Sequence, residues 1–424
     1  MNYNTFLYLF GFNSDDFKDT LVDPIKEDEK TYSLYVEQRT DTNRICPFCN
    51  SNKVIIKDFD FVSYNIIHGK GEKCKITIKK VRFKCKSCNK TYTPEIQNIT
   101  RRNEILDSTK QSIVRNFVDK ISFSDIAKNY FVSVTTVINI FDKAYSFVPR
   151  NEMPSILCID EFYFSKEYDQ NYCCVISDMK KKKIVDVLKN RRKEYLNEYF
   201  SNISVREREK VKYFVSDLYD EYRIVRKKFF KNATHIADRF HVVLQLTRAI
   251  SKRRVKVMNS VKNTNKILYN FMKSHWEYFE RSKFAIPNKE YKNKSTGIIY
   301  SYQNLFDKCL KLDHDLNSAY DVLQQIISRK FNYSENAETF MLNIADILDK
   351  CFDIDIKKVA STYRKWINEI SNAYAAYAIE NHISNSLAEQ INNNISTIIK
   401  VSCGLNNFER LRKRALIISN NKGR

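Results

Sequence analysis

The sequence predicts a multidomain α+β protein, because three stretches of different character follow one another along the chain. The first holds two Cys-x-x-Cys pairs among strand-like segments and continues into short amphipathic helices. The second is a series of apolar runs that end in aspartates, and the third has long helical periodicity. With 424 residues, the chain can form several structural units, each with its own apolar core.

The composition is that of a folded and strongly basic protein. Phe and Tyr number 28 and 26 against six Gly and six Pro, which excludes a disordered or fibrous chain. The formal net charge is +22, with basic residues spread along the whole chain, so we expect a polyanionic partner, above all nucleic acid. A merely solvated basic surface is the alternative.

Neither a membrane span nor a signal peptide is expected. No apolar run has the length of a span, and the first residues lack a basic segment followed by an apolar one. The eleven cysteines have no regular framework of spacings, but four of them are spaced as metal ligands. We therefore expect a protein of the reducing cytoplasm without membrane contact.

Residues 1–40 are predicted to be a short lead that ends in a strand, and residues 41–98 a zinc ribbon. Four thiolates in two close pairs suit tetrahedral zinc, and the role is structural because four protein ligands leave no open position. An accidental or redox-active pair is the alternative. The predicted zinc ligands are Cys46, Cys49, Cys85 and Cys88.

Residues 104–148 are predicted to form a helix-turn-helix. Ser122 and Asp125 have the spacing of a capping box for the middle helix, and Ser133 is the expected N-cap of the third. The buried face of the third helix is predicted to hold Val134, Val137, Ile138 and Phe141. Its outward residues, which could touch base edges or phosphates, are Thr135, Thr136, Asn139 and Lys143. A plain three-helix bundle is the alternative.

Residues 155–241 are predicted to form three meander strands followed by a helix, a strand, a helix and a strand. This order is typical of a ribonuclease-H-like sheet, in which Asp160 and Asp217 would lie at the ends of adjacent strands. Two such carboxylates suit the divalent ions that assist phosphoryl transfer. Each aspartate alone could instead be a turn or cap residue. The rival carboxylates are Glu161, Asp178 and Asp220.

Residues 242–380 are predicted to be almost entirely helical, and residues 381–424 to supply the final helices of the catalytic core. Lys252, Arg253 and Arg254 form a basic patch, which is either a track for the DNA backbone or a solvated helix face. In the final part, Glu389 falls on the polar side of a helix whose other side is apolar. From this pattern alone it could equally be a solvent-exposed glutamate.

Several motifs in a fixed order carry a family resemblance. They are CPFC, CKSC, CIDEF, VSDLYDEY, IADRFH, SNSLAEQINNNI and GLNNFERLRKRAL, from about Cys46 to Leu416. Together they resemble the bacterial insertion-sequence transposases of the ISL-three family. The resemblance implies a DDE triad at Asp160, Asp217 and Glu389, and a ribonuclease-H-like core interrupted by an all-α insertion. It also makes Asp238 and His241 of the IADRFH motif plausible supporting residues.

The activity implied by this resemblance is cleavage of double-stranded DNA at the terminal inverted repeats of an element. The freed 3′-hydroxyl ends would then attack and join target DNA, with the help of two Mg²⁺ ions that Mn²⁺ may replace. Work at two ends implies a homodimer or higher oligomer on DNA, in a bacterial, nucleoid-associated setting. Two other functions stay open: a DNA-binding regulator with an inactive nuclease-like fold, and a metal-dependent nuclease without strand transfer.

Overall fold

The computed structural model divides the chain into two compact units. Unit 1 comprises Met1–Pro149 and Thr397–Arg424, and unit 2 comprises Arg150–Ser396. Described in these units are residues 12–18, 25–27, 31–41, 44–68, 72–96, 105–146, 152–164, 172–292, 297–328, 336–375, 386–401 and 407–420.

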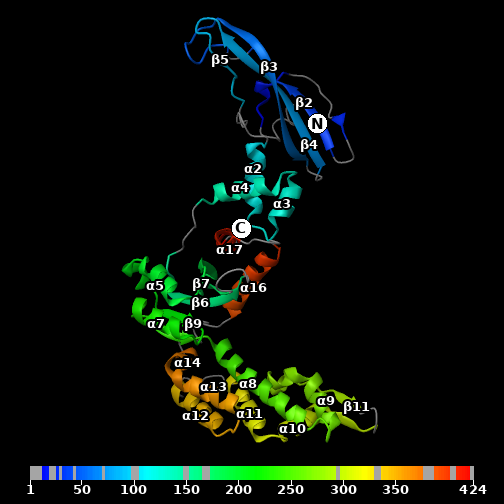
Figure 1. Cartoon of the computed structure of the whole chain (residues 1–424), viewed down its shortest axis with the longest axis vertical. Helices are drawn as coiled ribbons and strands as arrows, with labels where there is room; N and C mark the ends of the chain where they lie inside the picture. The colour runs from blue at the N-terminus through cyan, green and yellow to red at the C-terminus, as the bar shows by residue number, and fades with distance from the viewer. Residues whose placement is uncertain are drawn as a thin grey trace. The chain divides into compact units, whose positions relative to one another are not determined.

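A five-stranded sheet opens unit 1, and its centre is the long antiparallel pair β3 and β4 (Figure 1). β2 pairs with β4 in parallel, β1 pairs with β2, and β5 pairs with β4. The strands predicted for the zinc ribbon are confirmed, and the strand of the lead lies in the same sheet. The bounds are η1 Ser14–Asp16, β1 Ile25–Lys26, β2 Thr31–Glu37, β3 Val54–His68, β4 Glu72–Cys85 and β5 Thr91–Tyr92.

Three short helices follow, α2 (Asp107–Asn116), α3 (Phe123–Asn129) and α4 (Val134–Ala144). The capping box of Ser122 with Asp125 and the N-cap at Ser133 are both present, as predicted. On α4, Val137 and Phe141 are fully buried, but the prediction for Val134 was wrong, since it is 39% exposed. Val134 is the first residue of α4 and precedes the turns that pack against α2 and α3.

The last helix of the chain, α17 (Phe408–Asn420), belongs to unit 1. Its Ile417 joins the apolar core of α2, α3 and α4. Its Arg410 binds both carboxylate oxygens of Asp142, at 3.1 and 2.7 Å. The sequence analysis grouped this helix with the catalytic core. In the structure it packs on α2, α3 and α4, because its buried side chains contact those helices.

The sheet of unit 2 has the strand order β10-β9-β6-β7-β8. β6, β7 and β8 form an antiparallel meander, while β9 and β10 run parallel to β6. The predicted succession of strands and helices is confirmed, and β6 and β9 are neighbours as expected. The prediction that a strand ends at Asp160 was wrong, because β6 stays paired with β7 as far as Tyr163. The bounds are β6 Ile156–Tyr163, β7 Tyr172–Asp178, β8 Lys183–Leu188, α5 Lys193–Ser201, α6 Val205–Arg208, β9 Tyr213–Ser216, α7 Asp220–Phe229 and β10 Thr234–Ala237.

Each face of this sheet packs on a different core, because successive side chains of a strand point to opposite faces. Leu157 and Ile159 of β6 pack in a core with α5 and α7. Ile156 and Cys158 pack in the core of the helical region that begins with α8. The alternation along β6 therefore decides which side chain faces which layer.

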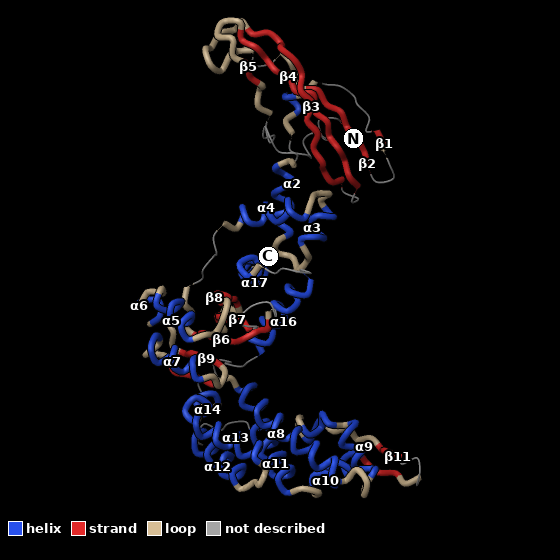
Figure 2. Tube along the Cα trace, in the orientation of Figure 1, coloured by secondary structure: helices blue, strands red, loops and turns tan. Residues whose placement is uncertain are grey.

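The rest of unit 2 is mainly helical (Figure 2). The expectation of an all-α insertion was wrong in one place, where β11 and β12 form a two-stranded antiparallel sheet. Pro287 and Gly297, which disfavour helix, flank this stretch, and Gly297 has a positive φ of 69°. The bounds are α8 Arg239–Ser260, α9 Lys266–Ser274, η2 Trp276–Phe279, η3 Lys283–Ala285, β11 Glu290–Lys292, β12 Ile299–Ser301, α10 Tyr302–Leu310, α11 His314–Ser328, α12 Ala337–Asp349, α13 Ile354–Lys365, α14 Ile367–Ala373 and α16 Ser386–Val401. None of the described helices has the length and apolar character needed to cross a membrane.

Candidate metal centres and nucleic-acid interface

Asp160 and Asp217 meet where the parallel pairing of β6 and β9 ends: β9 stops at Ser216, while β6 continues past Asp160 to Tyr163. Cys158 of β6 is in register with Val215 of β9, so two residues further on Asp160 comes beside Asp217. Cys158 and Val215 both face the helical core, and the period of two gives Asp160 and Asp217 the same orientation. The predicted pair is thus brought together by strand register and by side-chain alternation.

His241, from the first turn of α8, completes this group. One ligand atom from each of Asp160, Asp217 and His241 lies within 4.8 Å of the others. The Nε2 atom of His241 is 2.9 Å from Oδ1 of Asp217. Asp238 caps the same helix by accepting the backbone N–H of Phe240, which fixes the start of α8 and the place of His241.

The electrostatics of this group are those of a crowded acidic site. Burial, and then the charge of Asp217, raise the pKa of Asp160 to about 6, and burial raises the pKa of Asp238 to about 7. Burial opposes protonation of His241, but the contact with Asp217 outweighs it and raises the pKa of His241 to about 8. Burial and mutual repulsion both disfavour the ionised carboxylates. A divalent cation would offset both effects, so the group is suited to bind one.

α16 lies against the end of β6. Nδ2 of Asn392 donates to Oδ2 of Asp160 at 2.6 Å and to the backbone carbonyl of Glu161 at 3.3 Å. Ile391, Ile395 and Ile398 are buried on the apolar side of this helix, as predicted. Glu389 belongs to the same helix, three residues before Asn392. Its backbone position is therefore on the stretch of α16 that approaches Asp160.

The rival carboxylates have other partners. Glu161 accepts hydrogen bonds from Arg191 at 2.5 Å and from the Tyr222 hydroxyl at 2.9 Å. Asp178 accepts two backbone N–H groups of the turn that follows it. Asp220 pairs with Lys365 at 2.6 Å. Each of the three thus has a structural role that accounts for it.

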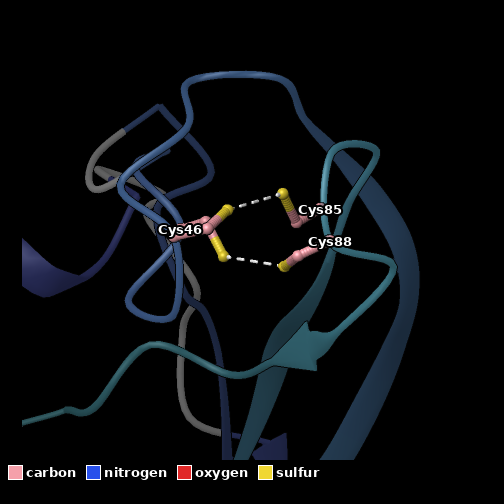
Figure 3. A group of neighbouring side chains, drawn as sticks. Cys46, Cys85 and Cys88 are labelled. Carbon is pink, nitrogen blue, oxygen red and sulfur yellow. Dashed lines mark hydrogen bonds between the residues drawn. The ribbon is translucent and has the colours of Figure 1, made fainter.

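The four predicted zinc ligands form a second group, in unit 1. The sulfur atoms of Cys46 and Cys88 are 3.6 Å apart, as are those of Cys49 and Cys85, and all four lie within 4.8 Å (Figure 3). Sulfurs at the corners of a tetrahedron around zinc would be about 3.8 Å apart, given a Zn–S bond of about 2.3 Å. The backbone N–H of Cys88 lowers the pKa of the Cys85 thiol to about 6, which favours the thiolate. The group is compatible with zinc.

The two knuckles share a backbone feature that residue spacing alone did not reveal. Asn50 and Asn89, each directly after the second cysteine of its pair, have positive φ values of 55° and 59°. Asn tolerates this left-handed conformation better than most residues. The repeated Cys-x-x-Cys-Asn pattern was the available signal, and it turns both pairs toward a common centre.

The predicted DNA-contacting residues of α4 are outward. Thr135, Asn139 and Lys143 are exposed, and Thr136 is half-buried, with its hydroxyl 2.9 Å from that of Ser133. This arrangement leaves a polar face on α4 opposite the core residues Val137 and Phe141.

The basic run of α8 is not the free patch that the sequence predicted. Arg253 is paired with Asp313 at 2.6 Å and lies near Asp353, and Lys252 is paired with Asp355 at 2.9 Å. Arg254 is buried and donates to the backbone carbonyl of Met272 at 2.7 Å. The i, i+1, i+2 spacing spreads these residues around the helix, where two of them pair with aspartates and the third is buried.

Two carboxylates and an imidazole on neighbouring parts of a mixed sheet form a group that could hold a metal ion. The chain belongs to the ISL-three family of DDE transposases, whose model, described as a transposase, matches residues 157–415. The match spans the sheet, the helical region and α16, and it ends within α17. No curated protein matches the chain.

Proposed function

We propose that this transposase cuts DNA at the ends of its element and joins the freed 3′-hydroxyl groups to target DNA. The observation that carries the proposal is the meeting of Asp160 and Asp217 where the parallel pairing of β6 and β9 ends, inside the region that the family model matches. Phosphoryl transfer without a covalent cofactor needs hard oxygen ligands at such a point.

The proposed ion-binding residues are Asp160, Asp217 and Glu389, with Mg²⁺ as the expected ion and Mn²⁺ as a substitute. When bound there, a pair of divalent ions would activate the attacking oxygen and stabilise the leaving oxygen. Asp160 and Asp217 would hold the ions from the sheet, and Glu389 from the helix opposite. His241 pairs with Asp217 and would be available as a nitrogen ligand, and Asn392 orients the Asp160 carboxylate.

Unit 1 is the proposed reader of the element ends. The four-cysteine group would hold one structural Zn²⁺ in a zinc ribbon, and α4 would lie in a major groove with Thr135, Thr136, Asn139 and Lys143 toward the DNA. The sheet of unit 2 would be the ribonuclease-H-like core. Cutting two ends requires two catalytic centres, so we expect a dimer or higher oligomer on DNA.

The test uses the purified full-length protein and linear DNA that carries its gene with several hundred flanking base pairs on each side. Wild type and Asp217→Asn are incubated with Mg²⁺, and all 3′-ends are mapped at nucleotide resolution. We expect breaks at a pair of inverted repeats and joined products with wild type alone. Asp217→Asn should still retard the DNA, because the substitution removes a charge from the metal centre and leaves unit 1 unchanged.

Other outcomes point to the two alternative functions. Breaks without any joined product would indicate a nuclease that lacks strand transfer. Retarded DNA without breaks in either protein would contradict the proposed cleavage and favour a DNA-binding regulator.

A further inference from the structure

A cleft lined by lysines lies in unit 2, at the start of β6 rather than at its acidic end. Its volume is about 740 Å³, and Lys180, Lys181, Lys183 and Lys210 line it. The first three come from the hairpin between β7 and β8, and Lys210 comes from the segment before β9. Four ammonium groups from two separate parts of the chain thus converge on one concave surface.

The positive charge of this cleft is largely uncompensated. Glu152 is the one exposed carboxylate among the lining residues, and it pairs with Lys210 at 2.8 Å. Asp178 also lines the cleft but is buried, and its Oδ1 accepts two backbone N–H groups. Within the described parts of the chain, Lys180, Lys181 and Lys183 are exposed and have no ion pair.

The hairpin that presents the lysines is held in one conformation. The Asp178 carboxylate accepts the backbone N–H groups of Lys180 and Lys181, at 2.9 and 3.0 Å, which fixes the turn. Lys182 has a positive φ of 55°, a conformation in which glycine is far less strained. Lys182 therefore adds a positive charge to the turn at a conformational cost that glycine would avoid. Such a cost is expected where the charge serves a function.

The cleft and the basic run of α8 differ in how far neighbouring carboxylates neutralise their positive charge. Arg253 and Lys252 are already neutralised by aspartates of the same unit. The hairpin lysines keep their charge for an external partner. A phosphodiester backbone offers regularly spaced single negative charges, which a row of lysines neutralises without any requirement for base sequence.

The cleft also has a suitable distance from the proposed metal centre. Ser155 lines the cleft, and Asp160 lies five residues further along an extended segment. At about 3.3 Å per residue, this is a separation of about 17 Å. The cleft and the proposed metal centre thus lie at two points along the same strand, close enough for one DNA molecule to reach both.

We propose that this lysine cleft binds the phosphate backbone of DNA about 17 Å from the catalytic centre. The cleft is too small for a whole duplex, so one strand's backbone would occupy it. The inference rests on the proposed function in so far as DNA is the substrate of unit 2. It adds a backbone-binding site that is separate from the metal centre and from the helix-turn-helix.

The test measures the salt dependence of DNA binding by the full-length protein, using a labelled 40-base-pair duplex without Mg²⁺. The variant is Lys180→Gln with Lys181→Gln and Lys183→Gln. The matched control is Lys350→Gln with Lys357→Gln and Lys358→Gln, which removes the same charge from exposed lysines near and on α13. Thermal unfolding of all three proteins checks that the folds are equally stable.

The plot of log K against log salt has a negative slope. We expect this slope to be shallower in the cleft variant, by about one for each phosphate that the cleft no longer neutralises. By the same relation, its Kd at 0.1 M salt should rise roughly tenfold or more, while the control keeps the wild-type slope. Equal slopes and affinities of variant and control would overturn the inference and leave the proposed function standing. A wild-type protein that binds no DNA would overturn both.

Discussion

At the residue scale, side-chain alternation separates two adjacent acids that the sequence alone left as rivals. Asp160 has the orientation of Cys158 and faces the helical layer where His241 lies. Glu161 has the orientation of Ile159 and faces the layer of α7, where Tyr222 donates to it. The strand period therefore sends one carboxylate to the proposed metal centre and the next to an ion pair with Arg191.

Asn392 is the residue that connects α16 to the proposed metal centre, and Asn392→Ala should slow DNA cleavage. Loss of its 2.6 Å bond frees the Asp160 carboxylate to rotate and loosens α16, which carries Glu389. Groups that orient a metal ligand typically contribute about 10- to 100-fold in activity or metal affinity, and we expect a loss in that range. The measurement is the single-turnover cleavage rate as a function of Mg²⁺ concentration.

The control for this prediction is Asn393→Ala, the adjacent and exposed residue of the same helix. DNA binding should be the same in both variants, since unit 1 is unchanged. Equal cleavage rates and equal Mg²⁺ dependence in the two variants would show that the Asn392 hydrogen bond has no part in the reaction.

The local pattern predicted the two aspartates, and only the family resemblance pointed to His241; Asn392 was not predicted. Asp160 and Asp217 each end a local apolar run, so a local pattern is enough to find them. His241 and Asn392 reach the same point only because α8 and α16 fold onto the end of the sheet. Their local patterns are those of any polar residue on a helix, and no periodicity distinguishes them.

At the element scale, the segments with strong local signals were predicted well. The meander strands of unit 2 and the capped helices α3 and α4 have clear periodicity and stop signals. The last helix was assigned to the wrong partner, because its apolar stripe does not say which core it completes. The contact that joins α17 to the helix-turn-helix is made by Arg414, which is buried and donates to backbone carbonyls of the loop between α2 and α3.

Arg414→Ala should therefore loosen the attachment of α17 to the helix-turn-helix. Arg414 donates to the backbone carbonyls of Asp119 and Ile121, both at 2.9 Å, and its guanidinium lies 4.9 Å from the centre of the Phe123 ring. Hydrogen bonds from a charged group contribute about 1.5–3 kcal/mol each, partly offset by the cost of burying the charge. We expect a net local loss of about 2 kcal/mol.

Amide hydrogen exchange is the suitable measurement, because two compact units need not unfold together. A loss of about 2 kcal/mol corresponds to roughly 30-fold faster exchange of protected amides in α3 and α17. Arg412→Ala, a change to a partly exposed arginine of the same helix, should leave exchange near the wild-type rate. Unchanged exchange in Arg414→Ala would mean that apolar contacts alone hold α17.

At the scale of the whole molecule, the net charge of +22 predicted a polyanionic partner but not the surface that meets it. The basic run in α8 was the predicted DNA track, yet Lys252 and Arg253 are paired with aspartates from elsewhere in the helical region and Arg254 is buried. Lys180, Lys181 and Lys183 of the hairpin are exposed and line the cleft. Charge compensation depends on tertiary neighbours, so one-dimensional charge patterns overestimate some patches and miss others.

The two proposed kinds of metal site lie in different units, so removal of each metal should affect a different step. Without Mg²⁺, the protein should bind the element ends with wild-type affinity and produce no breaks, because the carboxylates of unit 2 act only in the reaction.

Cys85→Ser should lose the bound zinc, since three remaining thiolates hold it far less tightly, and should weaken end binding through disorder of the ribbon. Zinc content by mass spectrometry and DNA retardation would be measured in parallel, with Cys351→Ala, a buried cysteine of the helical region, as the control. Unchanged zinc content in Cys85→Ser would contradict the four-thiolate site, and a loss of end binding on omission of Mg²⁺ would contradict the division of roles between the units.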